Sequence, residues 1–208
     1  MEYYEAVSKR RMVRDFKSQP VDLKTVKKIL SAGLKAPTND HMRNWEFVVL
    51  TDGALIEKVI KKIPKKVSDK RVNFILKSWR LKDDCQQKMY RDAIPKQYAM
   101  LSKSNCLILP LFKQGKNLLE PKSISSLNAF ASIWCCIESI LLAAAAEGLG
   151  CALRIPLNGE TEYVRQVLRL PEDYVFPCYL AIGHPEDEAV LPKQINRDLE
   201  SKLHLNAW

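Results

Sequence analysis

The sequence predicts an α+β sandwich in which helices cover both faces of a mixed sheet of four or five strands. Helical segments and short apolar, strand-like runs are interleaved along the chain, although unevenly. At 208 residues and 47% hydrophobic, the chain is long enough for one substantial core. It contains no internal repeat and no low-complexity linker. We therefore expect a single domain that spans residues 1–208.

The first quarter of the chain predicts two helices followed by a buried strand. A short helix, Tyr3 to Ser8, leads into a basic stretch, and a longer one runs from Leu23 to Ala36. Asp22 is placed to cap the longer helix, and Pro37 ends it because a residue before proline disfavours helical geometry. Trp45 to Leu50 is rich in aromatic and β-branched residues, which is typical of a buried strand.

The middle of the chain predicts further helices, a second buried strand and a turn. The helices are Ala54 to Ile63, Val67 to Leu81, and Cys85 to Lys103 with a break at Pro95. The strand is Cys106 to Phe112, and the turn is Gln114 to Asn117. We expect the long insertion between the two strands to cover another part of the domain.

The second half predicts a buried helix followed by shorter elements. Ser125 to Glu147 is apolar on nearly every side, which indicates burial on more than one face, and Gly148 is a left-handed C-cap. The remaining elements are the strand Cys151 to Ile155, the helix Thr161 to Leu168, the strand Tyr174 to Ile182 and a turn or helix within Leu199 to Leu205. Pro177 predicts irregular pairing in the last strand.

The formal net charge of +9 favours an anionic partner, such as a nucleotide phosphate, a nucleic acid or an acidic membrane surface. The densest basic cluster consists of Lys61, Lys62, Lys65, Lys66, Lys70 and Arg71. It lies in a polar segment without a helix-turn-helix, zinc-finger or aromatic RNA-binding signature, and a solvated helical face explains it. We therefore expect no nucleic-acid partner.

The cysteines and the apolar segments predict a soluble cytoplasmic protein. The six cysteines form no Cys-x-x-Cys pair and no metal-finger spacing. Several lie in apolar runs, where free thiols behave as small core residues, and this fits a reducing compartment. The first residues, Met1 to Glu5, include two acids and no apolar stretch, which argues against a secretory signal. Ile133 to Ala146 contains Glu138 and is shorter than the roughly 20 residues that span a bilayer, so we expect no membrane partner.

The stretch from Lys9 to Phe16 is the most informative in the chain, because three arginines fall within five residues. They are Arg10, Arg11 and Arg14. Val13 and Phe16 are expected to anchor the stretch in the core, which would hold the guanidinium groups at a fixed reach. Guanidinium groups match phosphate in a bidentate way, so an anionic ligand is the natural partner. The alternative is a helix end with ordinary surface arginines.

The rest of the sequence offers no catalytic constellation beside these arginines. No Gly-x-Gly-x-x-Gly turn follows a strand, no Ser/His/Asp order or paired-carboxylate motif is present, and the three histidines share no metal-ligand spacing. We therefore assign no catalytic side chain and no metal. The polar loop Thr38 to Asn44 is suited to ligand contacts, with a simple connector as the alternative. A redox cofactor that supplies its own chemistry fits this pattern.

Five motifs follow one another along the chain. They are Arg10 to Phe16, Ala36 to Trp45 with the strand after it, Ala143 to Gly150, Ala181 to Pro185, and Arg197 to Trp208. In this order they resemble the nitroreductase family of FMN-dependent NAD(P)H oxidoreductases. The resemblance leaves roughly residues 63–105 without a match. It implies the family's three-layer α-β-α sandwich, FMN as cofactor, NADH or NADPH as electron donor and a small-molecule electron acceptor.

The resemblance also implies a set of FMN-binding positions. Arg10 and Arg197 would hold the phosphate, Arg11 and Met12 would pack beside the ribityl chain, and Arg14 would approach the N1 and O2 edge of the ring. Pro37, Thr38, Asn39 and His41 would line the loop under the ring, and Leu153, Arg154 and Ile155 would offer a backbone donor to the N5 side. Lys193 is a further phosphate candidate, and Gln97 a contact to the pyrimidine edge.

The loop departs from the family's pattern at several positions. Met12 and Thr38 stand where the family commonly has serine. His41 replaces an asparagine, Arg43 a glutamine and Asn44 a proline. These changes leave the arginines in place and alter the contacts that the loop would make. His41 either touches flavin or substrate, or caps its own backbone.

We therefore expect an FMN-dependent NAD(P)H oxidoreductase that reduces nitroaromatic, quinone or similar acceptors by ping-pong hydride transfer through flavin N5. One alternative is a specialised flavin reaction, such as dehalogenation or flavin breakdown. Another is a nucleotide- or nucleic-acid-binding protein without turnover. The apolar helix needs a second partner, either another helix of the same chain or a second subunit. The resemblance implies a homodimer with FMN at the subunit boundary and the tail through Trp208 on the partner.

Overall fold

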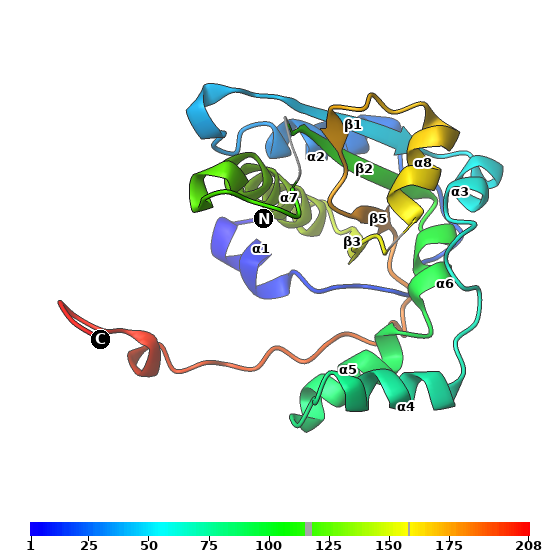
Figure 1. Ribbon diagram of the computed structural model, residues 1–208. Helices are drawn as coiled ribbons and strands as arrows, with labels where there is room; N and C mark the ends of the chain where they lie inside the picture. The colour runs from blue at the N-terminus through cyan, green and yellow to red at the C-terminus, as the bar shows by residue number, and fades with distance from the viewer. Residues whose placement is uncertain (115–117, 158) are drawn as a thin grey trace.

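A computed structural model describes residues 1–114, 118–157 and 159–208 and confirms the three-layer α+β sandwich (Figure 1). The central sheet has five strands in the order β1-β2-β5-β3, and the short β4 also pairs with β2. The strands are β1 (Trp45–Leu50), β2 (Cys106–Lys113), β3 (Gly150–Arg154), β4 (Tyr174–Val175) and β5 (Tyr179–Gly183). Pro177 falls between β4 and β5, so the strand predicted from Tyr174 to Ile182 is divided in two.

The prediction of a mixed sheet needs one correction. All pairings between the five strands are antiparallel. Parallel pairing in the described part of the chain is confined to a single bridge between Met12 and Cys151. Apolar runs such as β2 are buried on both faces, and this burial carries no information on strand direction, which depends on the connections.

The predicted helices are confirmed to within a few residues at their ends, except that the one predicted over Cys85 to Lys103 forms two. The α-helices are α1 (Tyr3–Lys9), α2 (Leu23–Gly33), α3 (Gly53–Val59), α4 (Asp69–Ser78), α5 (Asp84–Ala93), α6 (Gln97–Ser102), α7 (Asn128–Ala146) and α8 (Glu160–Leu168). Short 3-10 helices are η1 (Asn39–His41), η2 (Ile124–Leu127) and η3 (Glu200–Lys202). Asp22 caps α2 by accepting a hydrogen bond from the Thr25 amide, and Gly148 after α7 has φ +74°. Of the predicted turn at 114–117, residues 115–117 lie outside the described residues.

Alternating side chains of the central strand divide the core into two layers. Leu107 and Leu109 of β2 pack in a cluster that includes residues of α3, α6 and α8. Cys106 and Ile108 face the opposite cluster, which includes residues of α2 and α7. Because successive side chains of a strand point to opposite faces, one helical layer packs on each face of the sheet.

Helix α7 is the main buried helix, as its composition predicts. Ile133, Ile137 and Ile140 are buried, and the helix contacts α2, β2 and β3. By length and composition Ile124–Ala146 could cross a membrane, but core helices of globular proteins pass the same test. Besides the sheet, α7 therefore has α2 as a second packing partner within the chain. Cys135 stays exposed and Trp134 half-buried on the remaining face.

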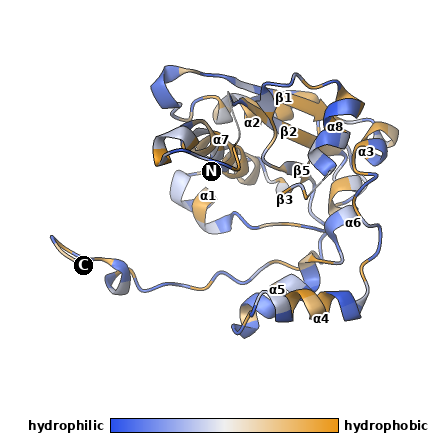
Figure 2. Cartoon of the chain, viewed as in Figure 1, coloured by the Kyte–Doolittle hydropathy of each residue, from blue (hydrophilic) through white to orange (hydrophobic). Residues whose placement is uncertain are grey.

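The insertion between β1 and β2 consists of α3 and α6 in the core and an α4–α5 hairpin outside it. Figure 1 shows α4 and α5 side by side below the body of the molecule. They share a small separate cluster formed by Val72, Leu76 and Ile94. Figure 2 shows mostly hydrophilic residues along α5, with hydrophobic positions on α4.

We predict that Gly150→Ala lowers the free energy of unfolding by about 1–3 kcal/mol. A Cβ at Gly150 would lie 2.7 Å from the Cβ of Val13, which follows α1 in the chain. Because a valine Cβ cannot swing away, the stretch itself would have to move. The control is Gly53→Ala at the start of α3, where a Cβ meets no described atom within 4 Å. Urea unfolding should show loss for Gly150→Ala alone, and equal effects of the two changes would contradict the explanation.

Candidate functional site

The arginine stretch lies along the edge strand of the sheet. The Val13 amide donates a hydrogen bond to the Cys151 carbonyl at 2.8 Å, and the Lys17 amide donates to the His184 carbonyl at 2.9 Å. The side chains of Val13 and Phe16 are 6% and 4% exposed, which confirms the predicted anchoring in the core. The stretch between these points is therefore held at both ends, with its arginines at a fixed reach.

The side chains of Arg10 and Arg11 contact different partners. Arg11 donates from Nη1 to the carbonyl oxygens of Ser8 at 2.6 Å and Arg10 at 2.8 Å, so its guanidinium is engaged by the backbone. The Arg10 guanidinium lies 3.5 Å from a carboxylate oxygen of Glu138 on α7, a long and partly exposed contact. Arg10 is therefore the freer of the two to bind an anion.

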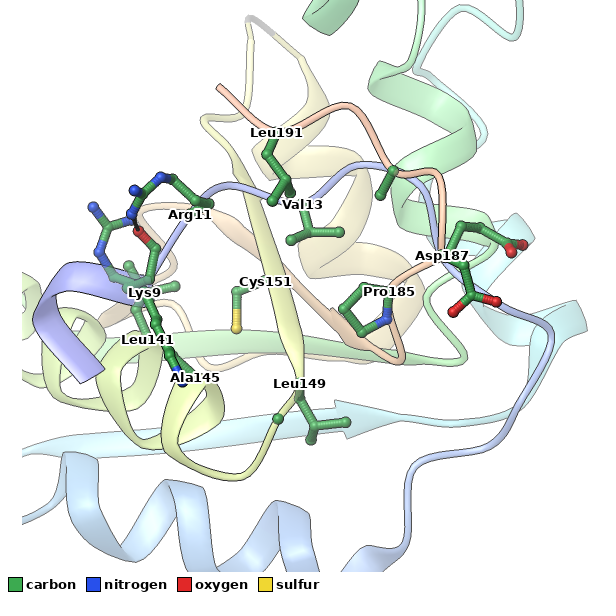
Figure 3. A pocket seen from close by; sticks show the side chains of 14 residues that line it. Lys9, Arg11, Val13, Leu141, Ala145, Leu149, Cys151, Pro185, Asp187 and Leu191 are labelled. Carbon is green, nitrogen blue, oxygen red and sulfur yellow. Dashed lines mark hydrogen bonds between the residues drawn. The ribbon is translucent and has the colours of Figure 1, made fainter. Parts of the chain in front are cut away.

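A cavity of about 240 Å³ lies between the stretch, α7, β3 and the segment after β5. Lys9, Arg10 and Arg11 line one part of it, and apolar side chains such as Leu141 and Leu191 line another. Figure 3 shows Lys9 and Arg11 on one side and Pro185 and Asp187 on the other, with Cys151 between them. Such a cavity suits a molecule with both an anionic and an apolar part. Burial raises the pKa of the Cys151 thiol to about 12, so a thiolate nucleophile is not available there.

Arg14 points instead toward helix α5. Its Nη2 lies 3.6 Å from the sulfur of Met89, and its Nη1 is buried without a hydrogen-bond partner among the described residues. Burial lowers the pKa of Arg14, while the carboxylates of Asp92 and Asp15 raise it. A buried guanidinium N–H without a partner is costly, and the described residues supply no acceptor at this position.

A small ionic cluster holds the arginine stretch to the insertion. The ammonium group of Lys96 lies 2.7 Å from a carboxylate oxygen of Asp15 and 2.6 Å from one of Asp92. These two hydrogen-bonded pairs raise the pKa of Lys96 against the opposing effect of burial. The cluster fixes the end of α5 beside Arg14.

The loop after α2 forms a second, separate location. The Asn39 amide donates to the hydroxyl of Ser132 on α7 at 2.9 Å, and Thr38 accepts from the Arg43 amide. Asp40, His41 and Arg43 have left-handed φ values of 48°, 52° and 51°. Three non-glycine residues in that region within four positions indicate a strained loop of the kind that clusters at ligand sites.

The loop and the arginines line different cavities. Thr38 and Asn39 border a cavity of about 50 Å³ with residues of β1, β2 and α7. The two cavities share none of the residues that line them. Pro37 and His41 are exposed on the same loop. The chain therefore does not bring all predicted FMN contacts to one place.

The remaining predicted residues are also dispersed. Leu153 is half-buried and Ile155 is exposed after β3, while the Arg154 side chain forms a buried ion pair with Glu160. Gln97 donates from its amide to the Ala93 carbonyl at 3.1 Å. Lys193 and Arg197 are exposed on the extended tail, which Figure 1 shows running away from the body, and they line neither described cavity.

Sequence reasoning missed Ser132, Met89 and Glu160, all of which contact predicted site residues. Ser132 falls on the buried side of the predicted α7, and a polar residue there indicates a contact with a neighbouring segment. Met89 and Glu160 gave no comparable signal in the sequence. No group of three or more His, Cys, Asp and Glu residues that could hold a metal occurs in the described part of the chain.

Curated proteins have sequences similar to that of this chain. The iodotyrosine deiodinase of Nematostella vectensis is 27% identical over 208 residues, which cover 98% of this chain and 75% of that protein. The NADPH-dependent oxidoreductase of Staphylococcus aureus strain USA300 is 26% identical over 188 residues, which cover 89% of this chain and 65% of that protein.

Solved structures show the same fold. The FMN-dependent nitroreductase of Clostridium difficile R20291 has a TM-score of 0.66 at 22% identity, covering 98% of each chain. An iodotyrosine deiodinase bound to FMN and 3-iodo-L-tyrosine has a TM-score of 0.70 at 19% identity, covering 100% of each chain. The model of the nitroreductase family matches residues 7–184, a range that includes the arginine stretch, the loop and all five strands. This chain belongs to the nitroreductase family.

Proposed function

We propose that the chain is an FMN-dependent oxidoreductase that takes electrons from NADH or NADPH and reduces a nitroaromatic, quinone or similar small acceptor. The observation that carries the proposal is the buried Nη1 of Arg14, which has no acceptor among the described residues. Two kinds of relative support it, a curated NADPH-dependent oxidoreductase and a solved FMN-dependent nitroreductase.

Two of the arginines fit the phosphate of FMN and the N1–O2 edge of its ring, which becomes anionic on reduction. Arg10, whose guanidinium has only a long contact to Glu138, would hold the phosphate. Arg14 would donate to the N1 and O2 edge of the ring, where its fixed positive charge favours the anionic reduced form. When bound, FMN supplies the chemistry of accepting a hydride and passing electrons on. The chain contributes the binding, the orientation and the positive charge of its arginines.

The same proposal includes a cytoplasmic homodimer. Lys193, Arg197 and the loop from Pro37 to His41 lie away from the arginine cavity, so a second copy is the simplest source of these contacts. The remaining face of α7 around Trp134 and Cys135 offers a surface for that copy. A free thiol such as Cys135 suits a reducing compartment.

A second candidate function is reductive dehalogenation of a halogenated phenol. Curated relatives named iodotyrosine deiodinase are 27% and 29% identical to this chain. Both candidates use the same flavin site and differ in the acceptor.

The test is anaerobic titration of the purified protein with NADH and NADPH, followed by a panel containing a nitrofuran, a quinone and 3-iodotyrosine. The first candidate function predicts bleaching of the bound flavin by a nicotinamide and turnover of the nitrofuran or the quinone. Because one pocket would serve donor and acceptor, double-reciprocal plots should be parallel. Preferential turnover of 3-iodotyrosine would favour dehalogenation. A protein that neither contains nor takes up FMN would contradict both candidates.

A further inference from the structure

The net positive charge of the chain is confined to one segment. Residues 61–103, which include α4, α5 and α6, hold 13 of the 33 Lys and Arg residues and 4 of the 24 Asp and Glu residues. Their formal net charge is therefore +9, and the other 165 residues carry 20 charges of each sign. Seven of the 13 basic residues and all four acids lie within residues 69–93, so the α4–α5 hairpin itself carries +3, and the other six basic residues flank it in the sequence.

Most of these cations are exposed and have no carboxylate partner. Twelve of the 13 are exposed, and within the described residues none of the twelve forms an ion pair with a carboxylate. The exception is the half-buried Lys96, which is held by Asp15 and Asp92. Elsewhere in the described chain, seven Lys and Arg residues have carboxylate partners. An excess of unpaired like charges on one segment creates a local field that attracts molecules of the opposite charge.

The same segment exposes two large aromatic side chains. Phe74 and Trp79 on and after α4 are 59% and 54% exposed. The guanidinium of Arg71 lies 5.2 Å from the centroid of the Phe74 ring, and Trp79 packs edge-on against Tyr90. An aromatic centre with arginine beside it and cations around it has the composition of a protein–protein contact surface.

The hairpin that carries this surface contacts the arginine stretch through α5. Met89 of α5 contacts Arg14, and Lys96 joins the end of α5 to Asp15. Figure 1 shows the hairpin of α4 and α5 projecting from the body on its own. A partner that touches α5 would therefore sit beside the helix that contacts Arg14, a position that matters for electron transfer to a flavin and not for attachment to a membrane or a nucleic acid.

We infer that the α4–α5 hairpin is the docking surface for a small acidic electron-carrier protein that serves as a second reductant. The inference rests on the proposed flavin function. Redox encounters use small, transient contact areas, which a two-helix hairpin provides, and charge complementarity accelerates them. Each reduced carrier loses one electron. Two carriers thus supply the two electrons that, with one proton from water, convert bound FMN to its anionic reduced form.

The test measures binding and reduction with one probe, a plant-type [2Fe–2S] ferredoxin. Binding of the oxidised ferredoxin to the flavin-loaded protein is measured by calorimetry at 20 and 200 mM NaCl, and flavin bleaching by the reduced ferredoxin is followed by stopped flow. Lys70→Glu/Lys77→Glu places two acids on the exposed face of α4 beside Phe74. We expect this variant to weaken ferredoxin binding by about tenfold at low salt, and salt to weaken binding to the wild type.

The matched control is Lys24→Glu/Lys27→Glu on α2, which changes the net charge equally at two exposed positions. It should change ferredoxin binding less than twofold, and both variants should keep the FMN content and NADPH-driven bleaching of the wild type. Equal losses in both variants, or no ferredoxin binding by a protein that holds FMN, would overturn the inference alone. Hairpin-dependent binding to phosphatidylserine vesicles or duplex DNA without ferredoxin binding would overturn it as well. Absence of FMN would instead overturn the proposed function beneath it.

Discussion

Replacing Arg154 with methionine is expected to lower the free energy of unfolding by about 3–5 kcal/mol, because it leaves a buried carboxylate without its partner. The side chains of Arg154 and Glu160 are each 6% exposed and form a bidentate pair, with a 2.7 Å bond from Nη2 to Oε1. The guanidinium carbon also lies 5.8 Å from the ring centroid of Tyr179, which is fully buried. Urea unfolding at saturating FMN would measure the loss.

The double variant Arg154→Met/Glu160→Met is the control for this prediction. Removing both charges leaves no unpaired ion, so most of the stability should return. The pair joins the end of β3 to the first turn of α8, and FMN binding should fall only as far as the fold is weakened. A variant Arg154→Met that keeps its stability but loses FMN affinity would show that this side chain is a ligand.

The fold was predictable where the local pattern determines it. Helical periodicity, Asp22 at the start of α2 and Gly148 after α7 act through neighbouring residues, so they placed these elements correctly. Strand direction depends instead on which distant segments pair. The antiparallel alignment of β3 with β5 is therefore absent from the pattern of either strand.

The candidate site was predictable in part, for a similar reason. The clustering of Arg10, Arg11 and Arg14 is local, and so is their anchoring through Val13 and Phe16. Their separate environments are not, since Arg11 turns back to the backbone, Arg10 faces α7 and Arg14 faces α5. The excess positive charge of residues 61–103 can be counted from the sequence. That α5, in the same segment, contacts Arg14 can be seen only in the structure.

The contrast between Arg14 and Arg11 gives a second large expected effect. Arg11 donates two hydrogen bonds to backbone carbonyls, whereas Arg14 keeps one buried Nη1 without an acceptor among the described residues. If FMN supplies that acceptor, the apo protein carries an unsatisfied buried donor that binding relieves. The two arginines are therefore a matched pair within one stretch for testing the proposal that one serves the fold and the other the ligand.

Arg14→Met should weaken FMN binding by about 10- to 100-fold, since a buried hydrogen bond to a charged group contributes about 1.5–3 kcal/mol. The same change should leave the melting temperature of the apo protein unchanged or raise it, because the unpaired buried N–H is removed. Arg11→Met should do the reverse, with lower apo stability and little loss of intrinsic FMN affinity. Fluorescence titration with FMN and thermal unfolding of the apo protein measure both quantities. If Arg14→Met destabilises the apo protein while FMN affinity is kept, Arg14 is a structural residue and the assignment of the ring edge to it is wrong.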